Sequence, residues 1–94
     1  GGPWKDSKVA ADENSDPYLM TAYDRKALRL SSVADASITA EVDLSGDGNW
    51  VSYRTFSVKA GEALEHPFPA AFSAYWIRFR SDREVTATAQ LDYR

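Results

Sequence analysis

The chain has 94 residues, of which 44% are hydrophobic and 27% charged, a composition that suits one globular domain and argues against global disorder. The formal charge is −3 and no Lys/Arg cluster forms a basic stripe, which argues against nucleic acid as a partner. The absence of cysteine and the single histidine, His66, exclude disulfides, thiolate chemistry and multi-histidine metal sites. No apolar run approaches the roughly 20 residues that cross a bilayer, so no membrane partner is expected.

Residues 1–17 lack hydrophobic periodicity and are rich in Gly, Pro, Asp, Asn and Ser. Such a composition is typical of a linker, because these residues favour turns over regular strands. We therefore predict an irregular leader over 1–17, strapped onto the domain by Trp4 and Val9, followed by a folded β-domain over 18–94.

Short strands with a period of two residues follow along the rest of the chain. They are predicted over 18–22, 27–32, 37–44, 50–58, 63–68, 74–81 and 84–93. The clearest alternation places Ile38, Ala40, Val42 and Leu44 inward. Pro67 suits an edge strand, because an edge position needs no ladder donor.

The pairing of these strands can also be predicted from the turns between them. Glu41 to Val58 contains two strand-forming runs around a Gly-rich turn and predicts a β-hairpin. The second run changes parity, which predicts a bulge near Arg54-Thr55. Strands 74–81 and 84–93 should pair as a second hairpin. The fold class is an all-β antiparallel sandwich of six or seven strands, immunoglobulin-like or jelly-roll-like, with no helix because no apolar series has a period of 3.6.

One spacing, Asp43-x-Ser45-x-Asp47-Gly48, matches the first half of a calcium loop, in which oxygens at alternate positions surround the ion. The match stops there, because Arg54 stands where the bidentate acid should be. Two interpretations remain open. Asp43, Ser45 and Asp47 either cap a glycine-rich hairpin turn or form a weak calcium site, which would be the sole cofactor expected.

The tryptophans suggest a ligand platform on one strand. Trp76 falls on the polar face of its strand beside Arg78 and Arg80, where a large ring can stack on a sugar while the arginines bind hydroxyls. Alternatively, Trp76 is covered by the leader, a partner domain or the other sheet, with the arginines stacked on it. Trp50, next to the turn, is either a hairpin anchor or a second platform.

Catalysis is not predicted. Exposed acids on turns are ordinary in an acidic protein, and no Ser, Thr or His arrangement supplies a nucleophile with its base. His66 is interpreted as a surface or strand-end residue without a catalytic part.

Three strings, DPYLMTAYDRKALRLSS, EVDLSGDGNWVSYRTFSVKAGE and FSAYWIRFRSDREVTATAQLDY, resemble the small all-β module at the C-terminal end of large bacterial secreted proteins related to sugar metabolism. The Gly-Asp-Gly turn and the Tyr75-Trp76 pair carry the likeness, which covers about residues 3–93. The resemblance implies an extracellular or periplasmic accessory domain, packed on or tethered to a preceding glycoside hydrolase or propeller-type domain.

Three functional hypotheses follow. The first is a non-catalytic accessory domain, structural or glycan-associated, of a larger carbohydrate-related protein, with a polysaccharide or the preceding domain as its partner. The second is a self-standing carbohydrate-binding module that uses the Trp76 face. The third is a protein–protein interaction or assembly domain with an exposed aromatic patch.

Overall fold

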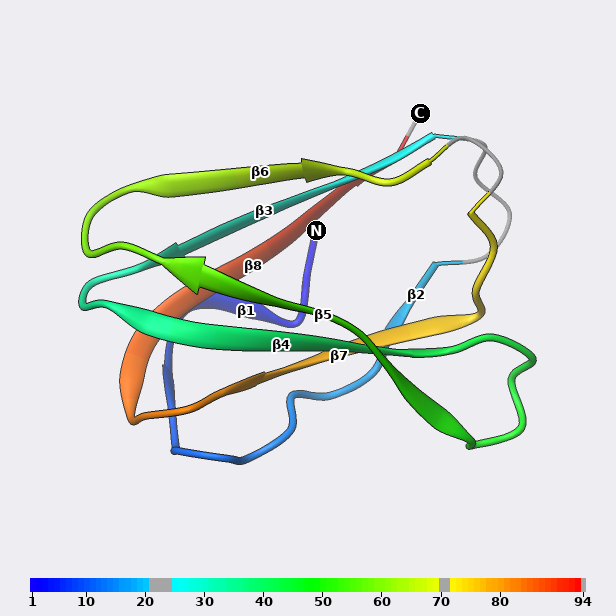
Figure 1. Ribbon diagram of the computed structural model, residues 1–94, viewed down its shortest axis with the longest axis horizontal. Helices are drawn as coiled ribbons and strands as arrows, with labels where there is room; N and C mark the ends of the chain where they lie inside the picture. The colour runs from blue at the N-terminus through cyan, green and yellow to red at the C-terminus, as the bar shows by residue number, and fades with distance from the viewer. Residues whose placement is uncertain (21–24, 70–71, 94) are drawn as a thin grey trace.

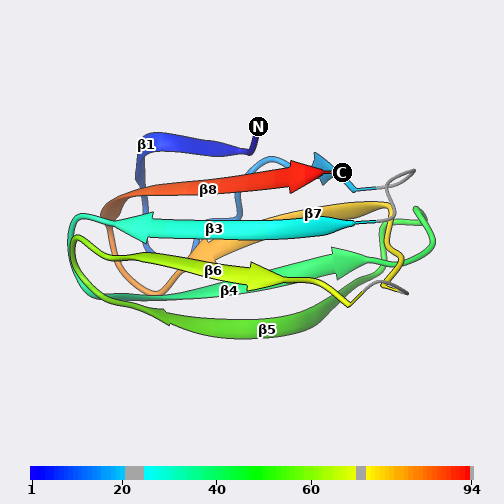
Figure 2. The same ribbon diagram turned by 90° about the horizontal axis from the view of Figure 1, so that it is seen from above.

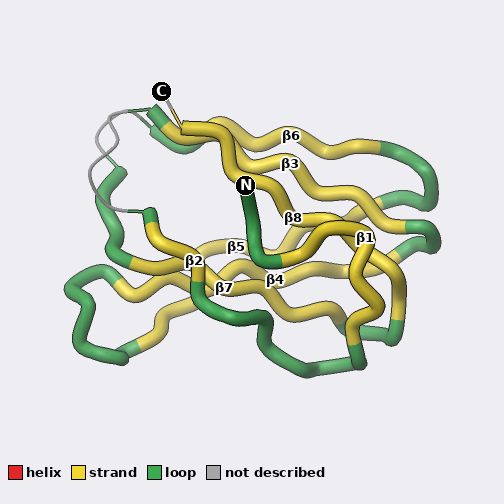
Figure 3. Tube along the Cα trace, turned by 180° about the vertical axis from the view of Figure 1, so that it is seen from behind, coloured by secondary structure: helices red, strands yellow, loops and turns green. Residues whose placement is uncertain are grey.

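The computed structural model describes residues 1–20, 25–69 and 72–93, and these residues fold into β-strands connected by turns and loops (Figure 3). The strands are β1 (Trp4–Val9), β2 (Tyr18–Leu19), β3 (Lys26–Ser32), β4 (Ala36–Asp43), β5 (Trp50–Val58), β6 (Ala63–Pro67), β7 (Trp76–Ser81) and β8 (Val85–Tyr93). No helix that could span a membrane occurs among the described residues.

The eight strands form two four-stranded antiparallel sheets. Sheet A has the order β1-β8-β3-β6, and these strands lie side by side in Figure 2. Sheet B has the order β2-β7-β4-β5, and Figure 1 shows β6 and β3 above β4 and β7. The two layers enclose one core, so the predicted all-β, sandwich-like architecture without helices is confirmed for the described residues, with eight strands in place of six or seven.

The core is a single cluster of hydrophobic side chains from both sheets. Buried residues alternate along β3, β4, β7 and β8, as the period of a strand requires. The largest fully buried hydrophobic side chains are Phe79, Met20, Leu28, Leu30, Ile38, Ile77 and Leu91. Burying such a side chain contributes about 1.5–3 kcal/mol relative to leaving it exposed, so packing can hold a domain that has no cysteine.

The predicted irregular leader is wrong for its first half, because residues 4–9 form β1 at the edge of sheet A. Trp4 pairs with Ala89, and the predicted strap is confirmed, since Trp4 and Val9 are both buried. The register shifts between Trp4 and Ser7, where Asp6 has a φ of 46°. This irregularity breaks the period of two, so alternation in the sequence could not reveal the strand.

The predicted β4–β5 hairpin is confirmed and contains the predicted bulge. Ala40 pairs with Arg54 but Glu41 pairs with Ser52, so Tyr53 is the extra residue, one position earlier than predicted. Among the described strands, β4 and β5 are the only consecutive pair that lies in one sheet; every other connection crosses to the opposite sheet.

The predicted second hairpin is wrong: β7 lies in sheet B and β8 in sheet A. Asp82 explains where the chain leaves sheet B, because it bonds back to Ser37 on β4. Its backbone N–H donates to the Ser37 carbonyl at 3.0 Å, and its Oδ1 accepts the Ser37 N–H at 2.9 Å. Both strands face the same core from opposite sides, so their alternation fits either arrangement.

The remaining strand boundaries differ by a few residues. β6 lies at the edge of sheet A, as Pro67 predicts. Leu44, predicted to point inward, is 52% exposed because β4 ends at Asp43 and the chain turns away there. The predicted strand over 18–22 is described only up to residue 20, and its last two residues lie outside the described residues.

Candidate ligand site on the outer face of sheet B

Four residues form a row across the outer face of sheet B. Asp43 on β4 pairs with Trp76 on β7 and with Trp50 on β5, and Trp76 in turn pairs with Leu19 on β2. Cross-strand partners point to the same side of a sheet, and neighbouring strands are about 4.8 Å apart, so the row is about 14 Å long. We call Leu19, Trp76, Asp43 and Trp50 the tryptophan row.

The tryptophan row borders an open depression of about 480 Å³. Its lining residues are Pro17, Asp43, Gly46, Gly48, Trp50 and Trp76. Both tryptophans are half-buried, and Pro17 belongs to the segment that precedes β2. Trp76 is therefore neither fully covered nor fully exposed, and the two predicted platform residues line the same hollow.

The predicted arginines lie beside the row and share one carboxylate. Arg78 Nε donates to Glu41 Oε1 at 2.8 Å, and Arg80 Nη1 lies 3.4 Å from Glu41 Oε2. The guanidinium carbon of Arg78 is 4.2 Å from the centre of the Trp50 ring, in cation–π range. One face of Trp50 is thus occupied by Arg78, and the ion pair fixes that contact.

Glu41 was not predicted as the partner of these arginines. Its side chain is only 14% exposed and that of Arg78 23%, so the pair is partly shielded from water. The sequence shows Glu41 on the outward face of its strand, but the pairing with Arg78 depends on the β4–β7 register, which the sequence does not reveal. If the register had been known, the opposite charges of these cross-strand neighbours would have predicted the ion pair.

Asp43 organises the loop at the end of the hairpin. Its Oδ1 accepts the backbone N–H groups of Gly46 at 2.9 Å and Asp47 at 3.3 Å, and its Oδ2 accepts that of Gly48 at 2.8 Å. Gly46 and Gly48 have φ of 76° and 83°, a region that favours glycine. Asp43 is 2% exposed, so its carboxylate acts as an internal cap for this loop.

The other two residues of the predicted calcium loop also take part in its internal bonds. The backbone N–H and the side-chain amide of Asn49 donate to the Asp47 carboxylate at 3.1 and 3.0 Å. These bonds, with a smaller contribution from Ser45, hold the pKa of Asp47 below its usual value. In residues 1–20, 25–69 and 72–93 no three His, Cys, Asp or Glu side chains are grouped closely enough to hold a metal ion.

The Tyr75 ring packs on the loop beside the row. A Cβ on Gly46 would lie 3.2 Å from the Tyr75 ring, so the ring and the loop backbone are in close contact. The Tyr75 N–H also donates to the Asp43 carbonyl at 2.9 Å. Tyr75 therefore connects the loop to β7 immediately before Trp76.

His66 lies near the end of β6, as predicted, but within an aromatic cluster that the sequence did not reveal. Its Nε2 is 2.8 Å from the Tyr53 hydroxyl, and its ring centre is 5.2 Å from those of Phe56 and Phe68. Burial, and secondarily the charge of Arg54, lower the pKa of His66. The bulge at Tyr53 brings the Tyr53 ring to β6. The aromatic cluster therefore closes the side of the domain between the edge strands β5 and β6.

Comparison with known proteins gives no match: no protein-family model fits the chain, and no curated protein or solved structure is significantly similar to it.

Proposed function

We propose that this chain is a non-catalytic, sandwich-like module that binds a carbohydrate through the tryptophan row. The observation that supports this function is the register itself: Trp50 and Trp76 flank Asp43 on one face and line one open depression. Two rings held on rigid strands form a site with little ordering cost on binding.

The chemistry of the depression suits a sugar better than a purely apolar ligand. Aromatic rings can stack on the C–H faces of a pyranose, and a few positioned polar groups can then orient its hydroxyls. Arg78 and Arg80 supply N–H donors, and Glu41 supplies carboxylate oxygens, next to the rings. The half-buried rings of Trp50 and Trp76 lie on either side of Asp43, a spacing that suits a segment of a glycan chain.

The wider setting of this function follows from the resemblance described above. The module would serve as an accessory domain of a larger extracellular or periplasmic carbohydrate-related protein, beside a catalytic or propeller domain. A self-standing carbohydrate-binding module would use the same face. The type of sandwich, immunoglobulin-like or jelly-roll-like, stays a prediction.

Calcium is not part of this proposal, because the oxygens of Asp43 accept three loop amides. A calcium ion bound by Asp43, Ser45 and Asp47 would compete with those bonds.

A glycan array probed with the isolated domain tests the proposal. We expect binding to at least one polysaccharide, reduced at least tenfold by Trp76→Ala and by Trp50→Ala. The matched control is Val33→Ala, which trims a hydrophobic side chain that is 67% exposed in the β3–β4 turn and should leave binding unchanged. Thermal melting of each variant separates loss of the site from loss of the fold.

Two results would overturn the proposal. One is the absence of binding to any glycan by a folded wild-type domain. The other is glycan binding that both tryptophan variants retain in full while folded. If the domain instead binds a protein through the row, the interaction-domain hypothesis replaces this one.

A further inference from the structure

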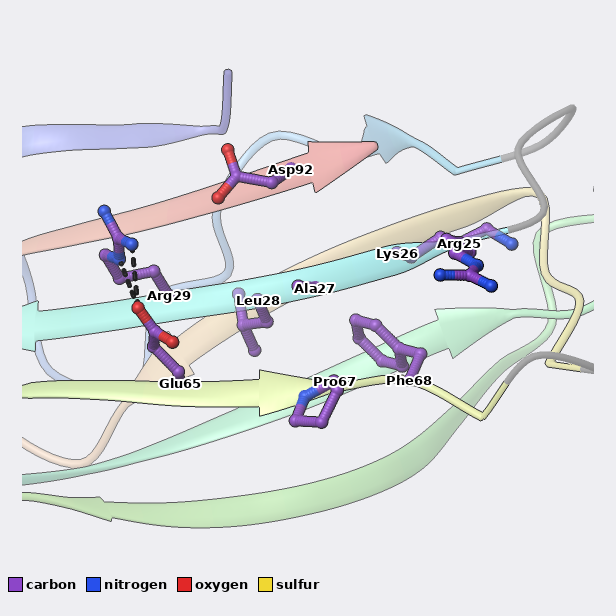
Figure 4. Close-up of a pocket in the computed structure, with 9 residues that line it drawn as sticks. All are labelled: Arg25, Lys26, Ala27, Leu28, Arg29, Glu65, Pro67, Phe68 and Asp92. Atoms are coloured by element: carbon purple, nitrogen blue, oxygen red, sulfur yellow. Dashed lines mark hydrogen bonds and ion pairs between the residues drawn. The ribbon is translucent and has the colours of Figure 1, made fainter. Parts of the chain in front are cut away.

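A second hollow lies on the outer face of sheet A, on the opposite side of the domain from the tryptophan row. Its centre is Ala27 on β3, which pairs with Pro67 on β6 and with Asp92 on β8 (Figure 4). The small side chain of Ala27 leaves room between its two neighbours. The resulting groove has a volume of about 420 Å³, within the range of small-ligand sites.

The walls of this groove carry an excess of positive charge. It is lined by Arg25, Lys26, Ala27, Leu28, Arg29, Glu65, Pro67, Phe68 and Asp92, which gives three cationic against two anionic side chains. Figure 4 shows the Arg29–Glu65 pair at one end of the groove and Arg25 at the other.

Most of these charges already have a partner. Arg29 donates to Glu65 Oε1 from Nε at 3.2 Å and from Nη2 at 2.7 Å. Lys26 Nζ donates to the Phe72 carbonyl at 3.2 Å. Arg25 is exposed, and within the described parts of the chain its guanidinium makes no hydrogen bond or ion pair. Arg25 is thus the cationic side chain of the groove that has no hydrogen bond or ion pair with the described residues.

Hydrogen-bond acceptors remain on the other walls. Both Arg29 bonds go to Glu65 Oε1, and the Gln90 amide donates to Asp92 Oδ1 at 3.3 Å. Among the described residues, neither Glu65 Oε2 nor Asp92 Oδ2 has a hydrogen-bond partner. These two oxygens can accept hydroxyl hydrogens, while Ala27 and Pro67 offer an apolar floor.

We propose that this groove binds a small carboxylate that carries hydroxyl groups, as a sugar acid does. Its carboxylate pairs with Arg25, its hydroxyls donate to Asp92, and its C–H face lies on Ala27 and Pro67. A guanidinium–carboxylate pair is a charge-assisted contact that a neutral sugar cannot make. This site is separate from the tryptophan row and does not depend on the function proposed for that row.

Amide chemical shifts measured while the domain is titrated with sodium glucuronate test this site, with glucose and sodium acetate as matched probes. We expect glucuronate at millimolar concentration to shift the amides of residues 25–29, Phe68 and Asp92. Glucose lacks the charge and acetate lacks the hydroxyls, so each should shift these amides at least fivefold less at equal concentration.

Variants locate the response. Arg25→Gln removes the charge and Ala27→Val fills the hollow with a strand-compatible side chain, so each should abolish the shifts. Trp76→Ala changes the other face and should leave them intact. The proposal is overturned if glucuronate shifts none of these amides, if glucose or acetate shifts them equally, or if folded Arg25→Gln responds as the wild type does.

Discussion

The outer faces of the two sheets both carry Arg–Glu pairs, but the two pairs differ in their exposure to water. On sheet B, Arg78 and Glu41 are 23% and 14% exposed, and Arg78 is stacked on Trp50. On sheet A, Arg29 and Glu65 form a similarly short pair but are 48% and 66% exposed. Water screens the second pair more strongly than the first, so similar distances imply different interaction energies.

This contrast bears on what each face can bind. Sheet B offers rings and donors that are already held in place, which lowers the entropy lost when a ligand binds. Sheet A offers a solvated groove in which Arg25 has no partner among the described residues. The first arrangement fits the glycan chain proposed for the tryptophan row, and the second fits the small carboxylate proposed for the groove.

The largest effect is expected from Asp43, on which the sheet B face depends. Asp43→Ala would leave three loop amides without their acceptor, and hydrogen bonds to a charged group contribute about 1.5–3 kcal/mol each at most. We expect the free energy of unfolding in urea to fall by about 3 kcal/mol. Asp43→Asn, which keeps the shape of the side chain, should lose less.

The loop explains why this loss should also affect the tryptophan row. Gly46 packs on Tyr75, which directly precedes Trp76. A disordered loop would therefore free the rings of Tyr75 and Trp76 to move. A change in unfolding free energy below about 1 kcal/mol for Asp43→Ala would contradict the capping role.

A matched pair of variants tests the contrast between the two faces directly. Glu41→Ala leaves Arg78 and Arg80 partly buried without a counter-charge, and we expect a loss of about 2 kcal/mol, between the costs of breaking surface and buried pairs. Glu65→Ala removes the exposed partner of Arg29 and should change stability within the error of the measurement. Equal losses in urea unfolding would show that exposure does not separate the two pairs.

Strands β2 to β8 could be predicted from the sequence because their signal is local. Alternation along 37–44 and 84–93 locates β4 and β8 within a residue at each end, and the parity change in β5 reveals the bulge near Tyr53. Pro67 likewise identifies an edge strand before any pairing is known. Each of these inferences depends only on residues that are close together in the sequence.

The pairing of strands and side chains could not be predicted, because it is non-local. Nothing in the alternation of β7 and β8 distinguishes one sheet from two, and β1 escaped detection because a shift in register interrupts its period. Trp76 could be assigned to the outward face of its strand, whereas its neighbours Asp43 and Glu41 follow only from the register. The Ala27 groove similarly requires the order β8-β3-β6.

The smallest effect is expected at the side of the domain where the two sheets meet, around His66. Burial lowers the pKa of His66 in the folded state, so between that value and the ordinary value of about 6.5 the unfolded chain binds more protons than the folded one. The stability that the neutral His66 side chain contributes is therefore fully present above pH about 6.5, and it is lost as the pH falls through that window. His66→Phe keeps an aromatic ring against Phe56 and Phe68 but cannot titrate, so urea unfolding of both proteins between pH about 8 and about 5 isolates the contribution of His66. We expect the wild type to lose more stability than His66→Phe over this range. Parallel curves would mean that the cluster tolerates the imidazolium, with the Tyr53 hydroxyl oxygen accepting a hydrogen bond from its N–H.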